Sequence, residues 1–517
     1  MADTANGVAS GSRRALWAEL AVLAAVAAAV RTVGVGGSLW LDELFTAWVV
    51  LGTDGTLAER AAVGNAAAPY YWLVKASVAV FGPAEWAIRL PSLAFGAAVP
   101  VAVYILARTV SGSVWAGRVA GLLVALDGVC CAYAAEARPY SVLQFFGTLQ
   151  LLAFWQLLAG GSGRWRGAFV ACTIATGYIH FVGLAVVAGE LAYYALLRMR
   201  GDRPAYSPGR FALDLALAGV ALLPLVPLVL AIVGRQANFD ISAKLIGLED
   251  LVILHRQPAY LILPFVAAAV VAFARRPAAD APRAWVAPLA FVLIVFYATA
   301  APLWAAHRAG GPTLFRVRYT MVLYLLPMVA AGAATVAWPG QWARVAFALT
   351  ALVLGQLADS PARRIAAGGS PRLTHDDWRG AVGWVNERSA PSAPVFVFAG
   401  WIETDGYLRS DDPLIRAYLI SPVRTVYPLT NPERPVRSLT FAGDLFSESD
   451  AEVIRTAGEA WFVVNGTGAF ADRVAVRATG RLSRGGLTAE VTDRKVFRNV
   501  VTFRLRLAPS RQQPAAP

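Results

Sequence analysis

Two adjacent carboxylates, Asp42 and Glu43, stand in the stretch SLWLDELFTAWVV, shortly after the first long apolar run of this 517-residue chain. Their neighbours are Trp, Leu and Phe, which are typical of a membrane interface. A carboxylate that is partly desolvated at the boundary between bilayer and water can act as a general base. The structural alternative is a solvated loop or a helix N-terminus, where the helix dipole stabilises acids.

Charged residues recur at two later junctions. Glu136 and Arg138 lie in CAYAAEARPYSV, which reads either as a helix-end ion pair or as part of a site facing Asp42. Arg316 and Arg318 lie in LFRVRYTMVLYLLP. They read either as interfacial snorkelling residues or as a clamp for a lipid phosphate, which the planar guanidinium suits.

Aromatic residues cluster in AAAPYYWLVKASV, where Tyr70 and Tyr71 predict an interfacial belt and Lys75 an anchor or a weaker phosphate contact. His180, in GYIHFVG, is expected at an outer helix end, where the residues themselves favour a satisfied or interfacial histidine. The sequence contains neither a phosphate-cradling Walker loop nor HExxH, and its four His and three Cys are dispersed. External carboxylates and cations without a nucleotide loop favour a lipid-linked donor over a cytosolic nucleotide.

The elements that must position these residues are membrane helices. The chain is 57% hydrophobic and 15% charged, whereas a soluble protein carries about 25% charged residues. The net charge of +13 is concentrated in short Arg-containing loops, so we assign it to membrane topology rather than to nucleic acid. Three cysteines in apolar runs predict small core residues, since they lack the spacing of metal ligands.

About eleven spans are predicted at roughly 20 residues per crossing. They fall near 15–33, 89–108, 115–134, 140–159, 167–180, 183–198, 211–232, 259–274, 284–303, 320–336 and 342–358. Placing the cytoplasmic tail 1–14 inside gives the inner loops the larger share of Arg, so the chain is expected to be a multi-pass protein of the cytoplasmic membrane. The odd number of spans then puts outer loops at 34–88, 233–258 and 304–318 and the C-terminal region outside.

Composition changes at about residue 360, after the transmembrane module 15–358. The segments PVFVFAG and AWFVVNG predict buried strands, and VFRNVVTFRLRL alternates like a half-buried strand. Helices are expected at 402–419 and 448–458. The fold class predicted is therefore a polytopic α-helical membrane protein with an extracytoplasmic α/β domain at 360–517.

These pieces resemble the C-type glycosyltransferase superfamily, especially the bacterial enzymes similar to glycosyltransferase family 39. Relatives are the protein O-mannosyltransferases and the aminoarabinose lipid A transferases. The matching segments, in chain order, are LWLDEL, AAAPYYWLVKASVAVFGPAEWAIRLPS, EARPYS, YIHF, RYTMVLYLLP and DDWRGAVGWV. One departure concerns the family's HPP motif, in which Ala67 and Ala68 stand before Pro69, so the role of that His and the substrate class are left open.

The resemblance implies direct, inverting sugar transfer from a polyprenyl-phosphate donor, with Asp42 as the base. Glu43 and Glu136 would orient the acceptor or assist the base. Arg138, Arg316, Arg318 and, more weakly, Lys75 would hold the phosphate. The substrate pocket is expected to include Trp40, Tyr70, Tyr71, Tyr140, His180 and Tyr319.

The acceptor is left open among a cell-envelope glycan, a lipid and a secreted protein. No cofactor is predicted, and a divalent cation between Asp42 and Glu136 is left open. One alternative is a transporter or flippase of lipid-linked sugars, which explains the spans but accounts less well for the outer domain. Another is a glycan-binding sensor protein without catalysis. Transfer of phosphoethanolamine or another lipid-borne group on the same fold is a further alternative.

Overall fold

The computed structural model places the chain in two compact units, which we describe separately. The first unit is Met1–Val35, Ala66–Tyr70 and Arg89–Leu373, and the second is Gly36–Asn65, Tyr71–Ile88 and Thr374–Pro517. The described residues are 2–235, 246–252, 262–263, 266–267, 270, 286–309, 314–338, 340–401, 404–408, 410–440, 444–483 and 487–509.

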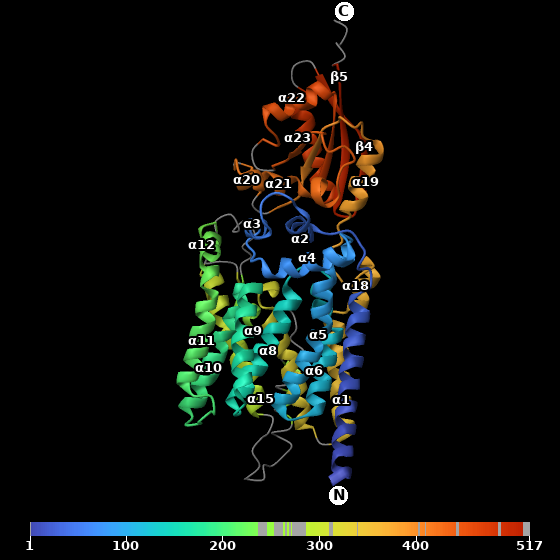
Figure 1. Ribbon diagram of the computed structural model, residues 1–517. Coiled ribbons are helices and arrows are strands. Elements are labelled where there is room, and N and C mark those ends of the chain that lie inside the picture. The colour runs from blue at the N-terminus through green and yellow to red at the C-terminus, as the bar shows by residue number, and fades with distance from the viewer. Residues whose placement is uncertain are drawn as a thin grey trace, which may run out of the picture. The chain divides into compact units, whose positions relative to one another are not determined.

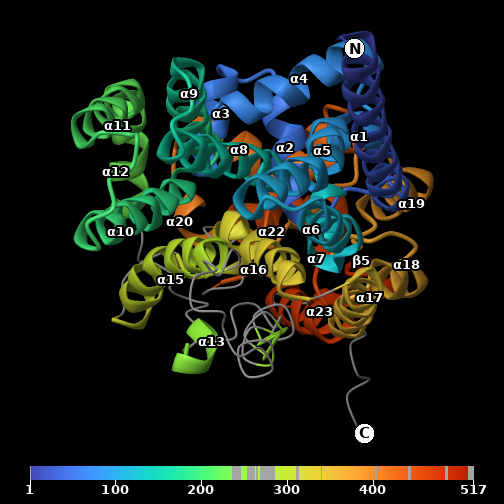
Figure 2. The ribbon, with the colours of Figure 1, turned by 90° about the horizontal axis from the view of Figure 1, so that it is seen from below.

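The first unit is a helical bundle (Figure 1). Its helices are α1 (Ala2–Arg31), α5 (Glu85–Ser111), α6 (Val114–Leu126), α7 (Gly128–Ala134), α8 (Tyr140–Leu158), α9 (Gly163–Ile179), η1 (Phe181–Ala185), α10 (Val186–Met199), α11 (Pro208–Leu222), α12 (Val226–Gly234), α13 (Leu248–Val252), α15 (Val286–Arg308), η4 (Val317–Tyr319), α16 (Met321–Ala334), α17 (Gln341–Ala358) and α18 (Pro361–Gly368). The four residues at the start of α5 group with the second unit. Helix α6 packs against α1 on one side and α16 on the other (Figure 2).

Six described helical segments are long and apolar enough to cross a membrane, and the bent pair α6–α7 raises this to as many as seven. Most of the predicted spans coincide with helices of the bundle, so the polytopic helical fold is confirmed. The predicted span 259–274 lies mostly outside the described residues, as do parts of the loops 233–258 and 304–318. The total of about eleven crossings stays a prediction.

The break between α6 and α7 turns the chain by 61° and leads it into the loop that carries Glu136. Asp127 adopts an extended backbone there and caps α7 by accepting a hydrogen bond from the Cys130 amide at 2.8 Å. The buried Arg31 side chain, at the end of α1, donates to the carbonyl oxygens of Val124 and Ala125 at 3.0 and 2.8 Å. These bonds give partners to carbonyl and amide groups that have none within the two helices, which stabilises the kink.

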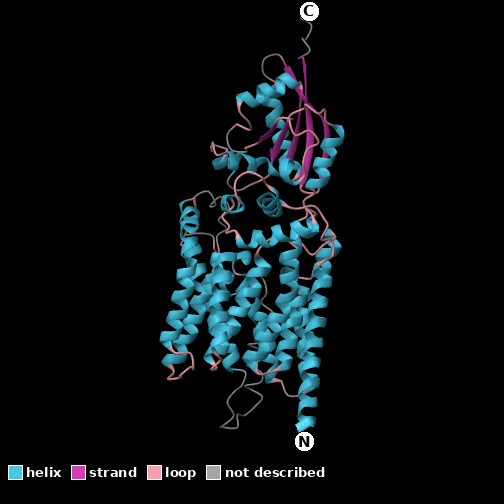
Figure 3. Cartoon of the chain, in the orientation of Figure 1, coloured by secondary structure: helices cyan, strands magenta, loops and turns pink. Residues whose placement is uncertain are grey.

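The second unit contains a five-stranded sheet of order β2-β1-β3-β5-β4, drawn in magenta in Figure 3. The strands are β1 (Val395–Phe398), β2 (Val436–Ser438), β3 (Glu459–Asn465), β4 (Leu487–Phe497) and β5 (Val500–Pro509). The pairs β2–β1 and β1–β3 are parallel, and β3–β5 and β5–β4 are antiparallel. The C-terminal α/β fold predicted from the sequence is therefore confirmed.

Helices cover both faces of this sheet. Neighbouring side chains on a strand point to opposite faces, so each strand contributes to both interfaces. Trp461 of β3 packs at 5.3 Å against Trp384 of α19 (Trp378–Arg388), measured between ring centroids. The next residue, Phe462, stacks at 4.8 Å on Phe503 and faces the core formed with α22 (Glu448–Ala457) and α23 (Gly468–Leu482).

Two local predictions need correction. The stretch VFRNVVTFRLRL is not one strand, because Phe497 pairs with Val500 across a two-residue turn in which Arg498 has a φ of 55°. The expected helix 402–419 is two helices in the described residues, α20 (Thr404–Tyr407) and α21 (Pro413–Ser421). Asp412 caps α21 ahead of Pro413, which starts a new helix rather than continuing one.

The segment that was predicted as the first outer loop provides further elements of the second unit. Helix α2 (Leu41–Leu51) packs against α3 (Leu57–Val63), α21 and the turn Pro422–Val426. Helix α4 (Pro69–Phe81) has most of its residues in this unit, although Tyr70 groups with the first. The unit that contains Asp42 and Glu43 is thus assembled from distant parts of the chain.

Candidate active site

Asp42 and Glu43 occupy the first turn of α2. The Glu43 carboxylate is buried and accepts a hydrogen bond from the backbone amide of Trp40 at 3.2 Å. Trp40 is the residue immediately before the helix, so this bond ties the first turn of α2 to the residue that precedes it. Asp42 is half-buried in the same first turn, where the positive end of the helix dipole favours a negative charge. It is the more exposed of the two acids.

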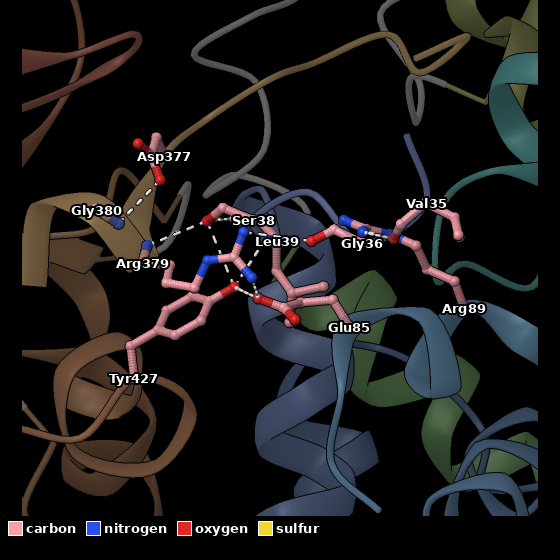
Figure 4. A network of polar contacts seen from close by, with 10 residues as sticks. All are labelled: Val35, Gly36, Ser38, Leu39, Glu85, Arg89, Asp377, Arg379, Gly380 and Tyr427. Atoms are coloured by element: carbon pink, nitrogen blue, oxygen red, sulfur yellow. Dashed lines mark hydrogen bonds and ion pairs between the residues drawn. The ribbon is translucent and has the colours of Figure 1, made fainter. Parts of the chain in front are cut away.

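The chain that enters α2 is held by a polar network of the second unit (Figure 4). The Tyr427 hydroxyl accepts from the Leu39 amide at 2.9 Å and donates to Glu85 at 3.2 Å. Arg379 pairs with the same carboxylate of Glu85 at 2.9 Å, and its backbone amide donates to Ser38 at 3.2 Å. These bonds fix the path of residues 36–39 and, through it, the start of α2.

An aromatic cluster packs behind the acids. Phe45, one turn after Asp42, meets the rings of Tyr71 and Tyr418 edge-on at 5.8 and 5.7 Å. Trp48 lies 4.9 Å from Tyr418. Tyr71 is 1% exposed, so the structure places this predicted pocket residue in the packing that supports α2.

Lys75 lies on the exposed side of α4, with its ammonium 6.0 Å from the ring centroid of Trp72. In the described part of the chain, the structure does not bring Lys75 into an ion pair with a carboxylate. Its predicted contact with a phosphate stays a prediction.

In the first unit, Glu136 and Arg138 occupy the loop between α7 and α8. The Glu136 side chain is fully buried, and its carboxylate accepts from the backbone amide of Leu373 at 3.2 Å. The Arg138 amide donates to the Glu136 carbonyl oxygen at 2.8 Å, which tightens the loop. Glu136 is thus a fixed part of the loop that carries Arg138.

Three segments of the first unit bring their predicted site residues together around His180. The His180 ring lies 6.3 Å from Tyr140 and 5.1 Å from Tyr319. The Arg138 guanidinium lies 5.8 Å from the centre of the Tyr140 ring, and the Arg318 guanidinium lies 4.9 Å from that of Tyr319. Both arginines lie close enough to His180 for their charges to act on it. The structure therefore creates a cationic, aromatic surface from residues far apart in the sequence.

Tyr70 joins this group through Ser92. The Ser92 hydroxyl donates to the Arg138 carbonyl oxygen at 2.7 Å and lies 2.8 Å from the Tyr70 hydroxyl. Arg316 stands two residues before Arg318, and its carbonyl oxygen accepts from the Thr320 hydroxyl at 3.0 Å. This bond fixes the backbone of Arg316 at the start of η4, while its side chain is half-buried.

The predicted site residues thus form two groups. Asp42, Glu43, Trp40, Tyr71 and Lys75 belong to the second unit, and Glu136, Arg138, Tyr70, Tyr140, His180, Arg316, Arg318 and Tyr319 belong to the first. A single site that combines Asp42 with Glu136 stays a prediction. Among the described residues, no group of three or more His, Cys, Asp or Glu side chains could hold a metal ion.

Sequence reasoning missed the residues that hold these groups in place. Ser92 lies in RLPS and Asp376 in DDWRG, two segments that were noted for their resemblance without a role for either side chain. Arg379 lies in the same DDWRG segment and was given no role either, and Tyr427 gave no signal in the sequence. Their partners Leu39 and Glu85 are distant along the chain.

Residues 56–242 match the family model for dolichyl-phosphate-mannose-protein mannosyltransferase. The predicted resemblance to C-type membrane glycosyltransferases is confirmed. The matched region contains the segments of Tyr70, Glu136, Arg138 and His180 and begins shortly after α2. No curated protein sequence matches the chain.

Solved structures also resemble this chain at low identity. ArnT from Cupriavidus metallidurans in the apo state is 13% identical with a TM-score of 0.42, over 96% of this chain and 98% of that one. The Archaeoglobus fulgidus oligosaccharyltransferase in complex with Zn and sulfate is 15% identical with a TM-score of 0.46, over 90% of this chain and 70% of that one. We draw no functional conclusion from likenesses of this size.

Proposed function

We propose that this protein is an inverting glycosyltransferase that moves a sugar from a polyprenyl-phosphate donor to an acceptor hydroxyl at the outer face of the cytoplasmic membrane. The observation that carries this proposal is the cluster of Arg138, Arg318, Tyr140, His180 and Tyr319, which gathers cations and rings from three segments of a membrane-embedded unit. The match to a mannosyltransferase family model supports the same chemistry.

Asp42 acts as the base in this proposal. The acceptor oxygen attacks the anomeric carbon, the bond from that carbon to the phosphate oxygen breaks, and the acceptor proton passes to the Asp42 carboxylate. The attack comes from the side opposite the phosphate, so the configuration at the anomeric carbon inverts. Glu43 keeps the first turn of α2 in shape through its bond to Trp40.

Arg138 and Arg318 hold the leaving phosphate. Guanidinium groups bind phosphate oxygens through paired hydrogen bonds and stabilise the charge that develops as the bond to the sugar breaks. The rings of His180 and Tyr319 are half-buried beside these cations and can take an apolar sugar face or the first part of the lipid. Tyr140 is 2% exposed and packs beneath them. Arg316 is the next candidate for the phosphate because it stands beside Arg318 in the chain.

The remaining parts of the proposal concern topology and partners. We place the tail 1–14 in the cytoplasm, the membrane module at 15–358 and the domain 360–517 outside the cell. The acceptor is a cell-envelope glycan, a lipid or a protein. A flippase of lipid-linked sugars is the alternative function, since it would bind the same donor without breaking a covalent bond.

The deciding experiment is a transfer assay with purified protein in detergent. Radiolabelled polyprenyl-phosphate sugars are supplied one at a time, with membrane and cell-wall extract as acceptor. Asp42→Asn is compared with wild type and with Asp54→Asn, a matched change at an exposed acid of the same unit. Transfer by wild type and Asp54→Asn but not by Asp42→Asn supports the proposal. Equal transfer by all three refutes Asp42 as the base.

The phosphate contact is tested by donor binding. Arg138→Gln and Arg318→Gln should each weaken binding of a polyprenyl-phosphate sugar by roughly tenfold or more, as expected for a charged hydrogen bond. Arg308→Gln, at the exposed end of α15, is the matched control and should bind as wild type does. Intact donor binding together with no transfer from any donor would favour the flippase.

A further inference from the structure

Asp376 is a buried acid of the second unit. It belongs to the segment before α19 and contacts the N-terminus of α2. Its carboxylate is 5% exposed and accepts a hydrogen bond from the backbone amide of Leu41, the first residue of α2. Helices need such acceptors because their first amides have no partner within the helix. The residue before α2 is Trp40, whose side chain carries a donor and no acceptor, so a cap must come from elsewhere.

The sheet holds Asp376 in this position. Asn499, in the turn between β4 and β5, donates to one carboxylate oxygen at 3.0 Å, and Asn465, at the end of β3, donates to the other at 3.2 Å. Both side-chain amides lie at the same end of the sheet, because Asn465 pairs with Val500, which is next to Asn499. The two asparagines and the α2 amide therefore occupy the carboxylate from different sides.

We propose that Asp376 is a positioning residue for the transfer reaction: it fixes the first turn of α2 to the end of the sheet and thereby sets the position of Asp42. This inference rests on the proposed function, in which Asp42 is the base. It also assigns a task to the C-terminal domain, which provides the support for the catalytic helix. A displacement of the base by about 1 Å costs roughly 100-fold in rate, so the support matters for turnover.

Asp450 provides a matched control. Its carboxylate also caps a helix, since it accepts from the Ser447 amide at 3.1 Å, but that helix is α22 and not α2. Removing either acid takes one cap from one helix of the same unit. A purely structural role for Asp376 would give the two changes similar effects.

The experiment measures kcat, the donor KM and the thermal midpoint of the full-length protein for Asp376→Ala, Asp376→Asn and Asp450→Ala. Asp376→Ala should lower kcat by roughly 10- to 100-fold with a donor KM within about twofold of wild type. Asp376→Asn keeps one acceptor oxygen and should recover part of this loss. Asp450→Ala should lower the thermal midpoint to a similar extent while kcat stays within about twofold of wild type, because the loss of a helix cap costs about 1 kcal/mol.

A second, independent variant distinguishes a loss of positioning from a loss of folding. Asn465→Ala combined with Asn499→Ala leaves Asp376 in place but removes the two amides that hold it, so kcat should fall in the same direction. Unchanged kcat in Asp376→Ala, or an equal loss in Asp450→Ala, would overturn the inference. Asp42→Asn is assayed in parallel: if it is inactive while Asp376→Ala is fully active, this inference alone fails, and if it is fully active, the assignment of the base fails.

Discussion

Tyr70 is joined to Arg138 through the hydroxyl of Ser92. The Ser92 hydroxyl donates its hydrogen to the Arg138 carbonyl oxygen, so the Tyr70 hydroxyl must be the donor in the 2.8 Å contact with Ser92. Both hydroxyl-bearing side chains are buried, at 1% and 0% exposure. The chain of bonds links α4 and α5 to the loop that carries a predicted phosphate ligand.

The change Tyr70→Phe should therefore weaken donor binding. It removes one buried hydrogen bond, which is worth about 1 kcal/mol, or about fivefold in an equilibrium constant. The donor KM is the quantity to measure. Tyr104→Phe is the control, because it removes a hydroxyl bond to Glu19 from another turn of α5. A KM that rises equally in both variants would contradict a specific role for Tyr70.

Gly64→Ala should disturb the support of α2. A Cβ at Gly64 would lie 2.2 Å from the ring of Phe45, which is itself enclosed by Tyr71 and Tyr418. Overpacking of this kind costs about 1–3 kcal/mol, and here it would also shift α2. Both the thermal midpoint and kcat should fall.

Gly383→Ala is the matched control for Gly64→Ala. Gly383 lies within α19, and a Cβ there would meet nothing within 4 Å. Alanine is the better helix former by about 1 kcal/mol, so this variant should be as stable as wild type or more so. Wild-type kcat in Gly64→Ala would show that Phe45 can move without effect on α2.

The pH dependence of stability should depend on Asp376. Burial raises the pKa of the Asp376 carboxyl, and the nearby Glu43 adds to this, while hydrogen bonds from Asn499, Asn465 and the Leu41 amide oppose it. The folded protein thus holds the proton more tightly than the unfolded chain. This contribution is fully present below the ordinary carboxyl pKa of about 4 and is lost as the pH rises through the raised pKa.

Asp376→Asn should remove this loss of stability with rising pH, since the amide does not titrate. The measurement is the difference in the free energy of unfolding between wild type and Asp376→Asn, followed by tryptophan fluorescence from pH 4 upwards. The advantage of wild type over the variant should be largest at the acid end and shrink as the pH rises. A difference that is constant over this range would contradict the assignment.

Glu190→Gln should be tolerated inside the membrane unit. Gln150 of α8 donates to Glu190 of α10 at 3.1 Å, and both side chains are fully buried. Among the described residues, the other carboxylate oxygen of Glu190 and the amide oxygen of Gln150 lack a hydrogen-bond partner. An amide at position 190 supplies the donor that Gln150 lacks, whereas Glu190→Leu leaves Gln150 unsatisfied at a cost of about 1–3 kcal/mol.

Thermal unfolding in detergent separates these variants. We expect Glu190→Gln to match or exceed wild type in its thermal midpoint and Glu190→Leu to fall below it. The reverse order would show that a carboxyl group is required between α8 and α10.

Apolar runs and charge patterns were sufficient to predict most helices of the membrane unit, because span length is fixed by the bilayer. The cluster of Arg138, His180 and Tyr319 could be anticipated as a set of candidates, but its assembly depends on how α8, η1 and η4 pack. The α6–α7 break was missed because the segments on either side of Asp127, GLLVAL and GVCCAYA, are both apolar and read as one continuous span. Its stability comes from Arg31, nearly a hundred residues away.

The C-terminal unit was predicted less completely. The buried strands β1 and β3 followed from their apolar sequences, but the β4–β5 turn at Arg498 carries no glycine to mark it. The role of Asp376 was also out of reach, since its three partners Leu41, Asn465 and Asn499 come from separate parts of the sequence. Capping by a distant residue leaves no local signature.

The assembly of the second unit from distant segments has a consequence for synthesis. Helix α2 leaves the ribosome about 300 residues before Thr374, where the C-terminal part of its unit begins. At about 5–20 residues per second, the acidic helix exists for roughly 15–60 s before synthesis of the C-terminal part of its unit begins. A nascent or prematurely terminated chain therefore contains Asp42 and Glu43 without the groups that fix them. We expect transfer activity only when translation is nearly finished.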